Sequence, residues 1–237
     1  MSTDVAVVTG GAGDIGRGVC RALTKAGATV VALDTDVSQA DGAARVMKCD
    51  VTDPAACASA VHEIVNDFGG IATLVNMAQA SRGWTPLLET TDEDMRSAFD
   101  SGPTATLRMM QLCHPYIKAR GGGAIVNFAS AAGTQGIPGM GAYAAAKEAI
   151  RGITKVAALE WGPDNIRVNV ICPFASSDAA QRFADGRWPE SVLETIPLRR
   201  HGDPETDIGA TIVFLAGPGT FITGRTLHVD GGSGTWR

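Results

Sequence analysis

Residues 9–16 read TGGAGDIG, and this segment decides the fold because of what stands on either side of it. A run of small and β-branched apolar residues precedes it, and a segment with helical apolar spacing follows. A glycine-rich turn between a strand and a helix lets phosphate oxygens reach backbone N–H groups, while the helix N-terminus favours an anion. The turn therefore predicts a phosphate-bearing ligand that contacts Gly10, Asp14, Ile15 and Gly16.

A carboxylate stands where the second predicted strand ends. Asp34 follows Gly16 by 18 residues, the spacing of an acidic side chain that hydrogen-bonds an adenosine ribose hydroxyl in a dinucleotide site. Its negative charge would repel a 2′-phosphate, and no Lys or Arg stands in the turn ahead of Gly16. Arg17, directly after the turn, is the one nearby exception. The sequence therefore predicts NAD as the cofactor, preferred over NADP.

Strand and helix patterns alternate along the rest of the chain. Strands are expected at residues 5–8, 29–33, 46–49, 73–75, 124–128, 168–171 and 226–229, and helices at 15–26, 54–68, 92–119, 142–162 and 204–215. Thr52 or Asp53 and Asp203 are expected N-caps. Regular alternation of this kind implies an α/β fold with a buried parallel sheet. No repeat or linker interrupts it, so we expect a single domain over residues 1–237.

The composition excludes several classes of protein. Of the 237 residues, 45% are apolar and 19% charged, which excludes a disordered chain, and the net charge of −5 gives no support for binding nucleic acid or an anionic membrane. The apolar runs are too short to span a bilayer. The five cysteines are scattered and the four histidines lack the spacing of metal ligands. We expect buried reduced thiols, no metal and a cytoplasmic protein.

One long segment breaks the alternation. Residues 173–202 carry Trp188 and several small residues without a regular apolar pattern. A stretch of this length in a compact domain is usually a functional loop. We interpret it as a substrate lid, the alternative being a surface excursion around one buried helix.

A second group of residues is typical of a catalytic site. Ser130 ends a predicted strand, and Tyr143 and Lys147 stand four residues apart on the helix that follows. Residues at i and i+4 share a helix face, so the ammonium lies near the phenol. A nearby cation favours the phenolate and makes proton exchange at neutral pH feasible. Ser130 is placed to hydrogen-bond the same substrate oxygen.

With these motifs the chain resembles the short-chain dehydrogenase/reductase family over nearly its whole length. The resemblance extends to the following positions: Asp50, Val51, Asn76, residues 125–127, residues 166–169, Pro173, residues 222–224 and residues 229–232. It implies a Rossmann-type, doubly wound parallel sheet of about seven strands with helices on both faces. It also implies hydride transfer between a nicotinamide and a carbinol or carbonyl carbon.

The resemblance assigns a role to each matching position. Tyr143 is expected to be the general acid/base, Ser130 to hold the substrate oxygen, and Lys147 to bind the nicotinamide ribose and lower the pKa of Tyr143. The remaining expected cofactor contacts are Asp50, Val51, Asn76, Ala78 and Pro173. The family is usually tetrameric through two long helices, which correspond here to residues 92–119 and 142–162.

Several positions depart from the family pattern. Asp14 replaces a glycine, and we expect its carboxylate to turn away from the cofactor and cap the helix. Gln79 replaces another glycine, so its side chain is expected at the substrate pocket. The family's asparagine of the proton relay falls on Gly102, the glycine after Pro173 falls on Phe174, and the threonine that holds the nicotinamide carboxamide falls on Asp178.

Two hypotheses follow. The leading one is an NAD-dependent oxidoreductase that interconverts a secondary alcohol and a ketone on a small apolar or cyclic substrate. Its pocket is expected to include Gln79, Trp84, Gln135, Phe174 and Trp188. The other is a degenerate member of the family that binds dinucleotide with little turnover, in which case Gly102→Asn is expected to raise activity. An enoyl reductase is disfavoured, because that branch spaces its Tyr and Lys more widely.

Overall fold

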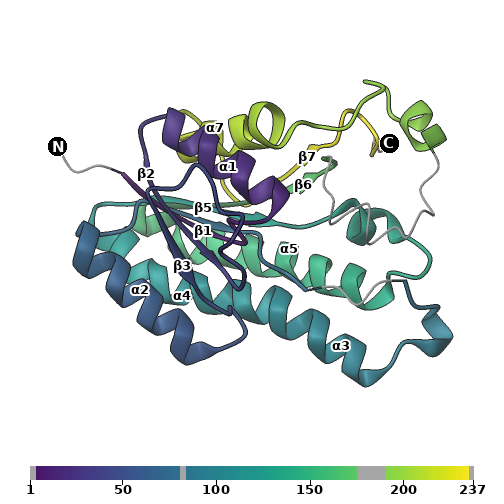
Figure 1. Ribbon diagram of the computed structural model, residues 1–237, viewed down its shortest axis with the longest axis horizontal. Coiled ribbons are helices and arrows are strands. Elements are labelled where there is room, and N and C mark those ends of the chain that lie inside the picture. Colours follow the sequence, from purple (N-terminus) through teal and green to yellow (C-terminus); the bar gives the residue numbers. More distant parts are fainter. Residues whose placement is uncertain (1–3, 81–83, 176–189, 235–237) are drawn as a thin grey trace.

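The computed structural model describes residues 4–80, 84–175 and 190–234, and its centre is one parallel sheet (Figure 1). Seven strands are ordered β3-β2-β1-β4-β5-β6-β7, and every neighbouring pair is parallel. They are β1 (Val5–Thr9), β2 (Thr29–Asp34), β3 (Arg45–Lys48), β4 (Thr73–Asn76), β5 (Gly123–Phe128), β6 (Ile166–Pro173) and β7 (Thr226–Val229). The predicted α/β class and strand number are confirmed. The strand order reverses between β1 and β4, and ligands bind at such a switch point in open α/β sheets.

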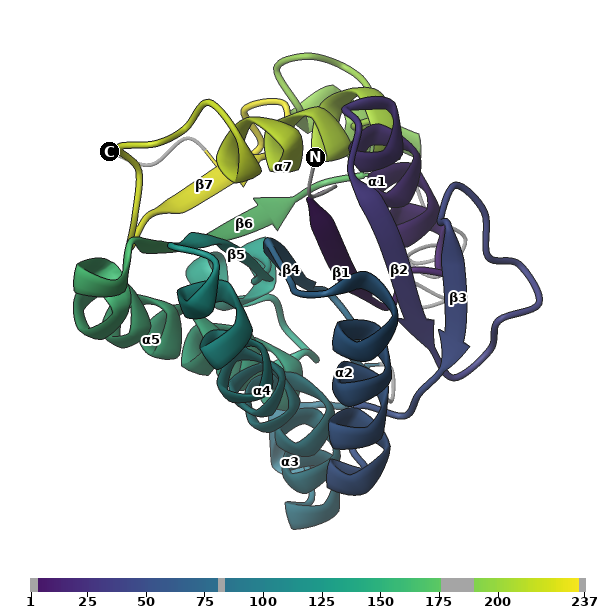
Figure 2. The same cartoon turned by 90° about the vertical axis from the view of Figure 1, so that its left-hand side faces the viewer.

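Helices cover both faces of the sheet (Figure 2). One face carries α1 (Asp14–Lys25) and α7 (Ala210–Ala216), and the other carries α2 (Pro54–Phe68), α4 (Ala105–Ala119) and α5 (Gly141–Trp161). Two buried clusters fill the layers between helices and sheet. The remaining helical elements are α3 (Asp92–Phe99), η1 (Leu87–Glu89), η2 (Asp100–Thr104), η3 (Ala132–Gly136), η4 (Gly162–Asp164), η5 (Glu190–Thr195) and η6 (Pro204–Gly209).

The central strands are apolar throughout because both of their faces are covered. All five residues of β1 are buried, as are residues 30–33 in β2. Parallel sheets with helices on both faces characteristically lack the alternation of polar and apolar residues seen in half-exposed sheets. The carboxyl ends of β1, β4 and β5 therefore meet at one edge of a rigid, dry layer.

Two predicted helices are interrupted by π-helical turns. The segment predicted as one helix over residues 92–119 divides into α3, the turn η2 and α4, with Pro103 inside the turn. Pro lacks an N–H and cannot continue the regular ladder of hydrogen bonds. The predicted helix at 204–215 begins with the π-helical η6 and continues as α7.

The expected caps at Asp53 and Asp203 are confirmed. The Asp53 carboxylate accepts hydrogen bonds from the N–H groups of Ala55 and Ala56, and Asp203 accepts from those of Glu205 and Thr206. In both cases the side chain satisfies backbone donors that a helix start leaves without intrahelical partners.

Other sequence expectations concern the thiols and the long segment at residues 173–202. All five cysteines are free and buried. Within the described ranges, no helix is long and apolar enough to cross a membrane. The two ends of the long segment meet, because the N–H of Gly202 donates to the carbonyl oxygen of Phe174 over 3.0 Å and Ala175 forms a bridge with Gly202.

Candidate active site

The turn after β1 is tight because glycine stands where backbone approaches backbone. Gly10 has a φ of +72°, and a Cβ on it would lie 3.0 Å from the backbone nitrogen of Ala78. A Cβ on Gly16 would lie 2.1 Å from the carbonyl oxygen of Gly10. Any side chain at either position would force the turn apart, so the first turn of α1 stays directly beneath the glycine-rich loop.

The expected capping role of Asp14 is wrong. The N-cap of α1 is Gly13, with no side-chain capping bond, and Asp14 is the first residue of the helix. Gly13 takes the extended conformation, with φ −69° and ψ 168°, that an N-cap requires. The Asp14 carboxylate instead forms an ion pair with Arg17, 2.9 Å from its Nη2. This pairing places a cation beside the one acidic residue of the turn.

Asp34 lies at the end of β2 against the same turn. Its Oδ2 accepts a hydrogen bond of 3.0 Å from the backbone N–H of Ala12. The carboxylate is therefore held beside the glycine-rich loop, at the place where the sequence predicts a ribose contact. Arg17 reaches the adjoining loop, where its Nη1 donates to the carbonyl oxygen of Gln39 over 3.4 Å.

Asp50 and Val51, two of the cofactor contacts that the resemblance implies, lie beyond β3. Oδ1 of Asp50 accepts hydrogen bonds from the N–H and hydroxyl of Thr52, and these bonds lower the pKa of the Asp50 carboxyl. Val51 is buried, and its carbonyl oxygen accepts from Arg108 Nη1 over 2.6 Å. The loop is thus fixed by contacts with its own residues and with α4.

A buried pair of asparagines joins β4 to β5. Asn76 and Asn127 are register partners, and Nδ2 of Asn76 donates to Oδ1 of Asn127 over 2.9 Å. Asn127 in turn donates to Thr154 Oγ1 over 2.9 Å. Oδ1 of Asn76 is buried and has no hydrogen-bond partner among the described residues. Sequence reasoning did not identify Asn127 as the partner, although an asparagine within an apolar strand pattern was an available signal.

Ser130, Tyr143 and Lys147 come together at the carboxyl end of β5. Ser130 and Tyr143 are hydrogen-bonded through their side chains. Lys147 Nζ lies 5.4 Å from the centroid of the Tyr143 ring and donates to the carbonyl oxygen of Phe128 over 2.9 Å. The Lys147 side chain is only 4% exposed. The predicted grouping of these three side chains therefore exists in the structure.

Burial is the largest cause of the pKa shifts of Tyr143 and Lys147. Desolvation raises the pKa of Tyr143 to about 12, and the hydrogen bond with Ser130 only partly opposes that rise. Desolvation lowers the pKa of Lys147 to about 7. The lowered Tyr143 pKa that the resemblance implied is therefore not a property of the protein by itself. Burial shifts both groups toward their neutral forms.

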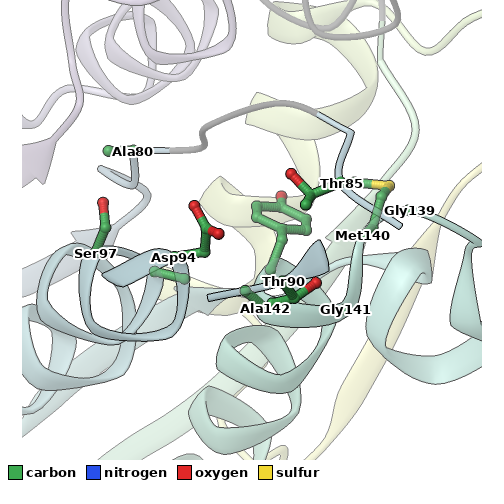
Figure 3. A pocket seen from close by; sticks show the side chains of 11 residues that line it. Ala80, Thr85, Thr90, Asp94, Ser97, Gly139, Met140, Gly141 and Ala142 are labelled. Carbon is green, nitrogen blue, oxygen red and sulfur yellow. The ribbon is translucent and has the colours of Figure 1, made fainter. Parts of the chain in front are cut away.

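A small cavity adjoins Tyr143 (Figure 3). Asp94 and Ser97 project toward it from α3, and Thr85 lies on its opposite side. Its walls also include Ala80, Thr90, Ala98 and residues 139–142, and its volume is about 30 Å³. By the usual minimum for a hydrated cavity, this is room for one or two waters. Of these lining residues, only Tyr143 was predicted as a site residue from the sequence.

The predicted pocket residues that the structure describes do not themselves line this cavity. Trp84 stands beside Gly139, where a Cβ would lie 2.8 Å from the indole. Gln135 lies on η3, with a buried Nε2 that has no partner among the described residues. The Phe174 ring stacks on His201 with centroids 5.1 Å apart. Trp188 and Asp178 lie outside the described residues.

Known proteins are similar to this chain over nearly its whole length. A family model described as enoyl-(acyl carrier protein) reductase matches residues 10–234. The chain is 38% identical to a 12alpha-hydroxysteroid dehydrogenase of Clostridium sp., over 97% of this chain and 96% of the relative. The structure of a short-chain type dehydrogenase/reductase from Mycobacterium ulcerans superposes with a TM-score of 0.89 at 27% identity, covering 98% of this chain and 91% of that one. NAD+-bound xylitol dehydrogenase gives a TM-score of 0.87 at 28% identity, covering 95% and 96%.

Proposed function

This chain belongs to the short-chain dehydrogenase/reductase family, and from that premise we propose that it interconverts a secondary alcohol and a ketone with NAD(H), using Tyr143 as general acid/base. The observation that carries the proposal is the grouping of Ser130, Tyr143 and Lys147 beside a small cavity. The substrate class is a small alcohol on a ring or a short carbon chain. A hydroxysteroid dehydrogenase and a xylitol dehydrogenase among the relatives support that choice.

The residues around the turn fit a dinucleotide. Glycine at positions 10 and 16 lets the loop pack directly against the Ala78 backbone and the start of α1, and α1 begins without a side-chain cap over its N-terminus. Backbone N–H groups at a helix start favour a pyrophosphate. Asp34 beside the loop favours a free ribose hydroxyl over a 2′-phosphate, so NAD is the proposed cofactor. The orphaned Oδ1 of Asn76 is a buried acceptor at the same edge of the sheet.

The side chains divide the work of alcohol oxidation between them. Bound NAD+ would supply the acceptor for the hydride of the carbinol carbon. The phenolate oxygen of Tyr143 takes the proton of the substrate hydroxyl, while Ser130 donates a hydrogen bond to the substrate oxygen and fixes its position. In the reverse direction the Tyr143 phenol returns that proton to the carbonyl oxygen.

Lys147 provides the electrostatic part of the mechanism. In its protonated form Lys147, with Nζ 5.4 Å from the ring centroid, favours the phenolate against the burial that raises the Tyr143 pKa. The bond to the Phe128 carbonyl oxygen holds the Nζ in place. Preorganised charge in a dry site is effective because no reorganisation is needed during the reaction.

A dehydrogenase assay tests the proposal. Wild-type protein is supplied with NAD+ and a panel of cyclic, steroidal and polyol secondary alcohols, and NADH formation is followed by its absorbance. We expect turnover with at least one class of alcohol. Tyr143→Phe is expected to lose it by roughly a hundredfold or more, because general acid/base catalysis is worth that much, while NADH binding stays within about twofold. Reduction of an enoyl thioester with no alcohol oxidation would overturn the proposal.

We propose in addition that the protein is a homotetramer assembled through α4 and α5. Leu107 on α4 and Val156 and Leu159 on α5 are exposed, Leu159 to 81%. Exposed apolar side chains on neighbouring helices are typical of association surfaces. Analytical ultracentrifugation of wild type and Leu159→Glu tests this, and a wild-type monomer at micromolar concentration would contradict it.

A further inference from the structure

Two departures from the family pattern, 23 residues apart in sequence, meet in space. Gly102 lies in the π-helical turn η2, and Gln79 lies three residues beyond β4. A Cβ built on Gly102 would lie 3.0 Å from Nε2, 3.1 Å from Cδ and 3.2 Å from Oε1 of Gln79. The whole carboxamide of Gln79 therefore covers the Cα of Gly102, where any side chain at position 102 would begin.

The fit is reciprocal. Contacts of 3.0–3.2 Å to three atoms of one planar group are closer than carbon normally tolerates, so even alanine at 102 requires the Gln79 carboxamide to shift. An asparagine at 102 would compete with it for the same space. Conversely, glycine at both positions would leave this space empty and no carboxamide in it. One carboxamide fits here, and in this chain it comes from Gln79.

The donor end of the carboxamide is anchored. Nε2 of Gln79 donates to the carbonyl oxygen of Ala98 over 3.5 Å. Ala98 stands in the last turn of α3, directly before the π-helical turn η2 that contains Pro103. The Gln79 amide therefore contacts the end of α3, where Pro103, which has no N–H, interrupts the regular helix.

The acceptor end is open. Oε1 of Gln79 is buried and has no hydrogen-bond partner among the described residues. A buried amide oxygen without a hydrogen bond destabilises the folded state, so such atoms normally receive a hydrogen bond from a water or a ligand. The geometry therefore calls for a donor at this oxygen beyond the described side chains.

Two neighbours of the Gln79 carboxamide line the cavity beside Tyr143. Ala80, the next residue after Gln79, lines that cavity, and so does Ala98, whose carbonyl Gln79 contacts. The loop is held there because the N–H of Ala80 donates to Ser101 Oγ over 3.2 Å, and Ser101 Oγ donates to the carbonyl oxygen of Ser97 over 2.8 Å. The cavity is large enough for one or two waters.

We propose that Gln79 is a positioning residue of the proton relay. Its carboxamide occupies the space beside Gly102, and its Oε1 accepts a hydrogen bond from a water in the Tyr143 cavity. This inference rests on the proposed dehydrogenase function. In alcohol oxidation Tyr143 receives one proton per turnover and must release it before the next. The water held by Gln79 takes that proton and passes one of its own toward solvent, so no atom is consumed.

Three variants and one control test the relay. Gln79→Ala is expected to lower kcat roughly tenfold to a hundredfold, the lower range of proton-transfer effects. Its KM and its NADH affinity are expected to stay within about twofold of wild type. A solvent deuterium isotope effect on kcat larger than in wild type is expected, because proton release becomes limiting. Asn66→Ala, which removes an exposed carboxamide from α2, is the matched control and is expected to change none of these quantities.

The most discriminating test exchanges the side chains at positions 79 and 102. Gly102→Asn alone is expected to lower both kcat and the melting temperature, because the introduced side chain and that of Gln79 compete for one space. Gln79→Gly/Gly102→Asn is expected to recover the melting temperature and to bring kcat to within a few-fold of wild type. Recovery of the melting temperature without recovery of kcat would show that a carboxamide filling this space does not by itself support turnover, and would contradict the relay role assigned to it.

The outcomes separate this inference from the proposed function. Alcohol turnover by wild type that Gln79→Ala leaves unchanged would overturn the role of Gln79 alone. Wild-type protein that binds NADH and oxidises none of the alcohols would overturn both.

Discussion

Lys147 makes the stability of the protein depend on pH in a direction that can be calculated from its burial. Its ammonium is 4% exposed, and desolvation lowers its pKa from the ordinary value of 10.5 to about 7. Between these two values the unfolded chain binds a proton at this lysine that the folded chain does not. Stability therefore rises with pH in this window, by up to about 1.4 kcal/mol per pH unit.

The perturbation that isolates this effect is Lys147→Met, which keeps the length of the side chain and removes the charge. With these two pKa values, the amount by which buried Lys147 lowers the free energy of unfolding falls by about 2 kcal/mol between about pH 7 and pH 9. For a chain of this size, that corresponds to roughly 4–8 °C in melting temperature. Below about pH 6 the lysine is charged in both states, so its contribution is nearly constant.

The assay is urea or thermal unfolding of wild type and variant at a series of pH values and fixed ionic strength. We expect the free energy of unfolding of wild type, minus that of Lys147→Met, to rise by about 2 kcal/mol from pH 7 to pH 9. Lys155→Met removes an exposed lysine from the same helix and is expected to leave the wild-type pH dependence unchanged. A flat difference for Lys147→Met across this range would refute the reasoning that burial lowers its pKa.

Two further substitutions test the cofactor contact and the buried polar pair. Asp34→Asn keeps an acceptor for the Ala12 N–H but removes the negative charge. In fluorescence titrations NADPH affinity is therefore expected to rise by roughly tenfold to a hundredfold, and NADH affinity to fall by about tenfold. An unchanged cofactor preference would contradict the role of Asp34, and Asp36→Asn, in the same loop, is the control with a smaller expected effect. Asn127→Leu leaves the buried Asn76 amide without its acceptor and is expected to lower the free energy of unfolding by about 2 kcal/mol in urea denaturation, whereas a change below about 0.5 kcal/mol would show that the pair contributes little.

The layers of the fold were predictable because they depend on local patterns. The glycine-rich turn, the all-apolar strands and the helix caps at Asp53 and Asp203 each have a short-range cause, and the structure bears them out. The grouping of Ser130, Tyr143 and Lys147 was also accessible, because helical spacing places Tyr143 and Lys147 on one face.

What failed depends on contacts that local patterns do not record. Asp14 is a good N-cap by type, but the extended backbone of Gly13 takes that position one residue earlier. The direction of the Tyr143 pKa followed from the depth of its burial, which no spacing reveals. Pro103 was a sequence signal for the break in the helix at residues 100–104. The apolar periodicity of residues 92–119 nevertheless favoured the prediction of one continuous helix.

Gly102 and Gln79 illustrate the same limit more sharply. Each was visible as a separate departure, and Gly102 alone suggested that an added asparagine would raise activity. The structure gives the opposite expectation for the single substitution, because the Gln79 carboxamide already fills the space. Only three-dimensional placement shows that one residue compensates for the other.

The most direct test of the account is a parallel titration of the wild-type protein with NADH and with NADPH, followed by fluorescence and by the shift in melting temperature. A ligand that binds only the folded state stabilises it by mass action, so both readouts report the same affinity. The account predicts that NADH binds at least about tenfold more tightly than NADPH, because of the carboxylate of Asp34. Tighter binding of NADPH, or binding of neither, would contradict it.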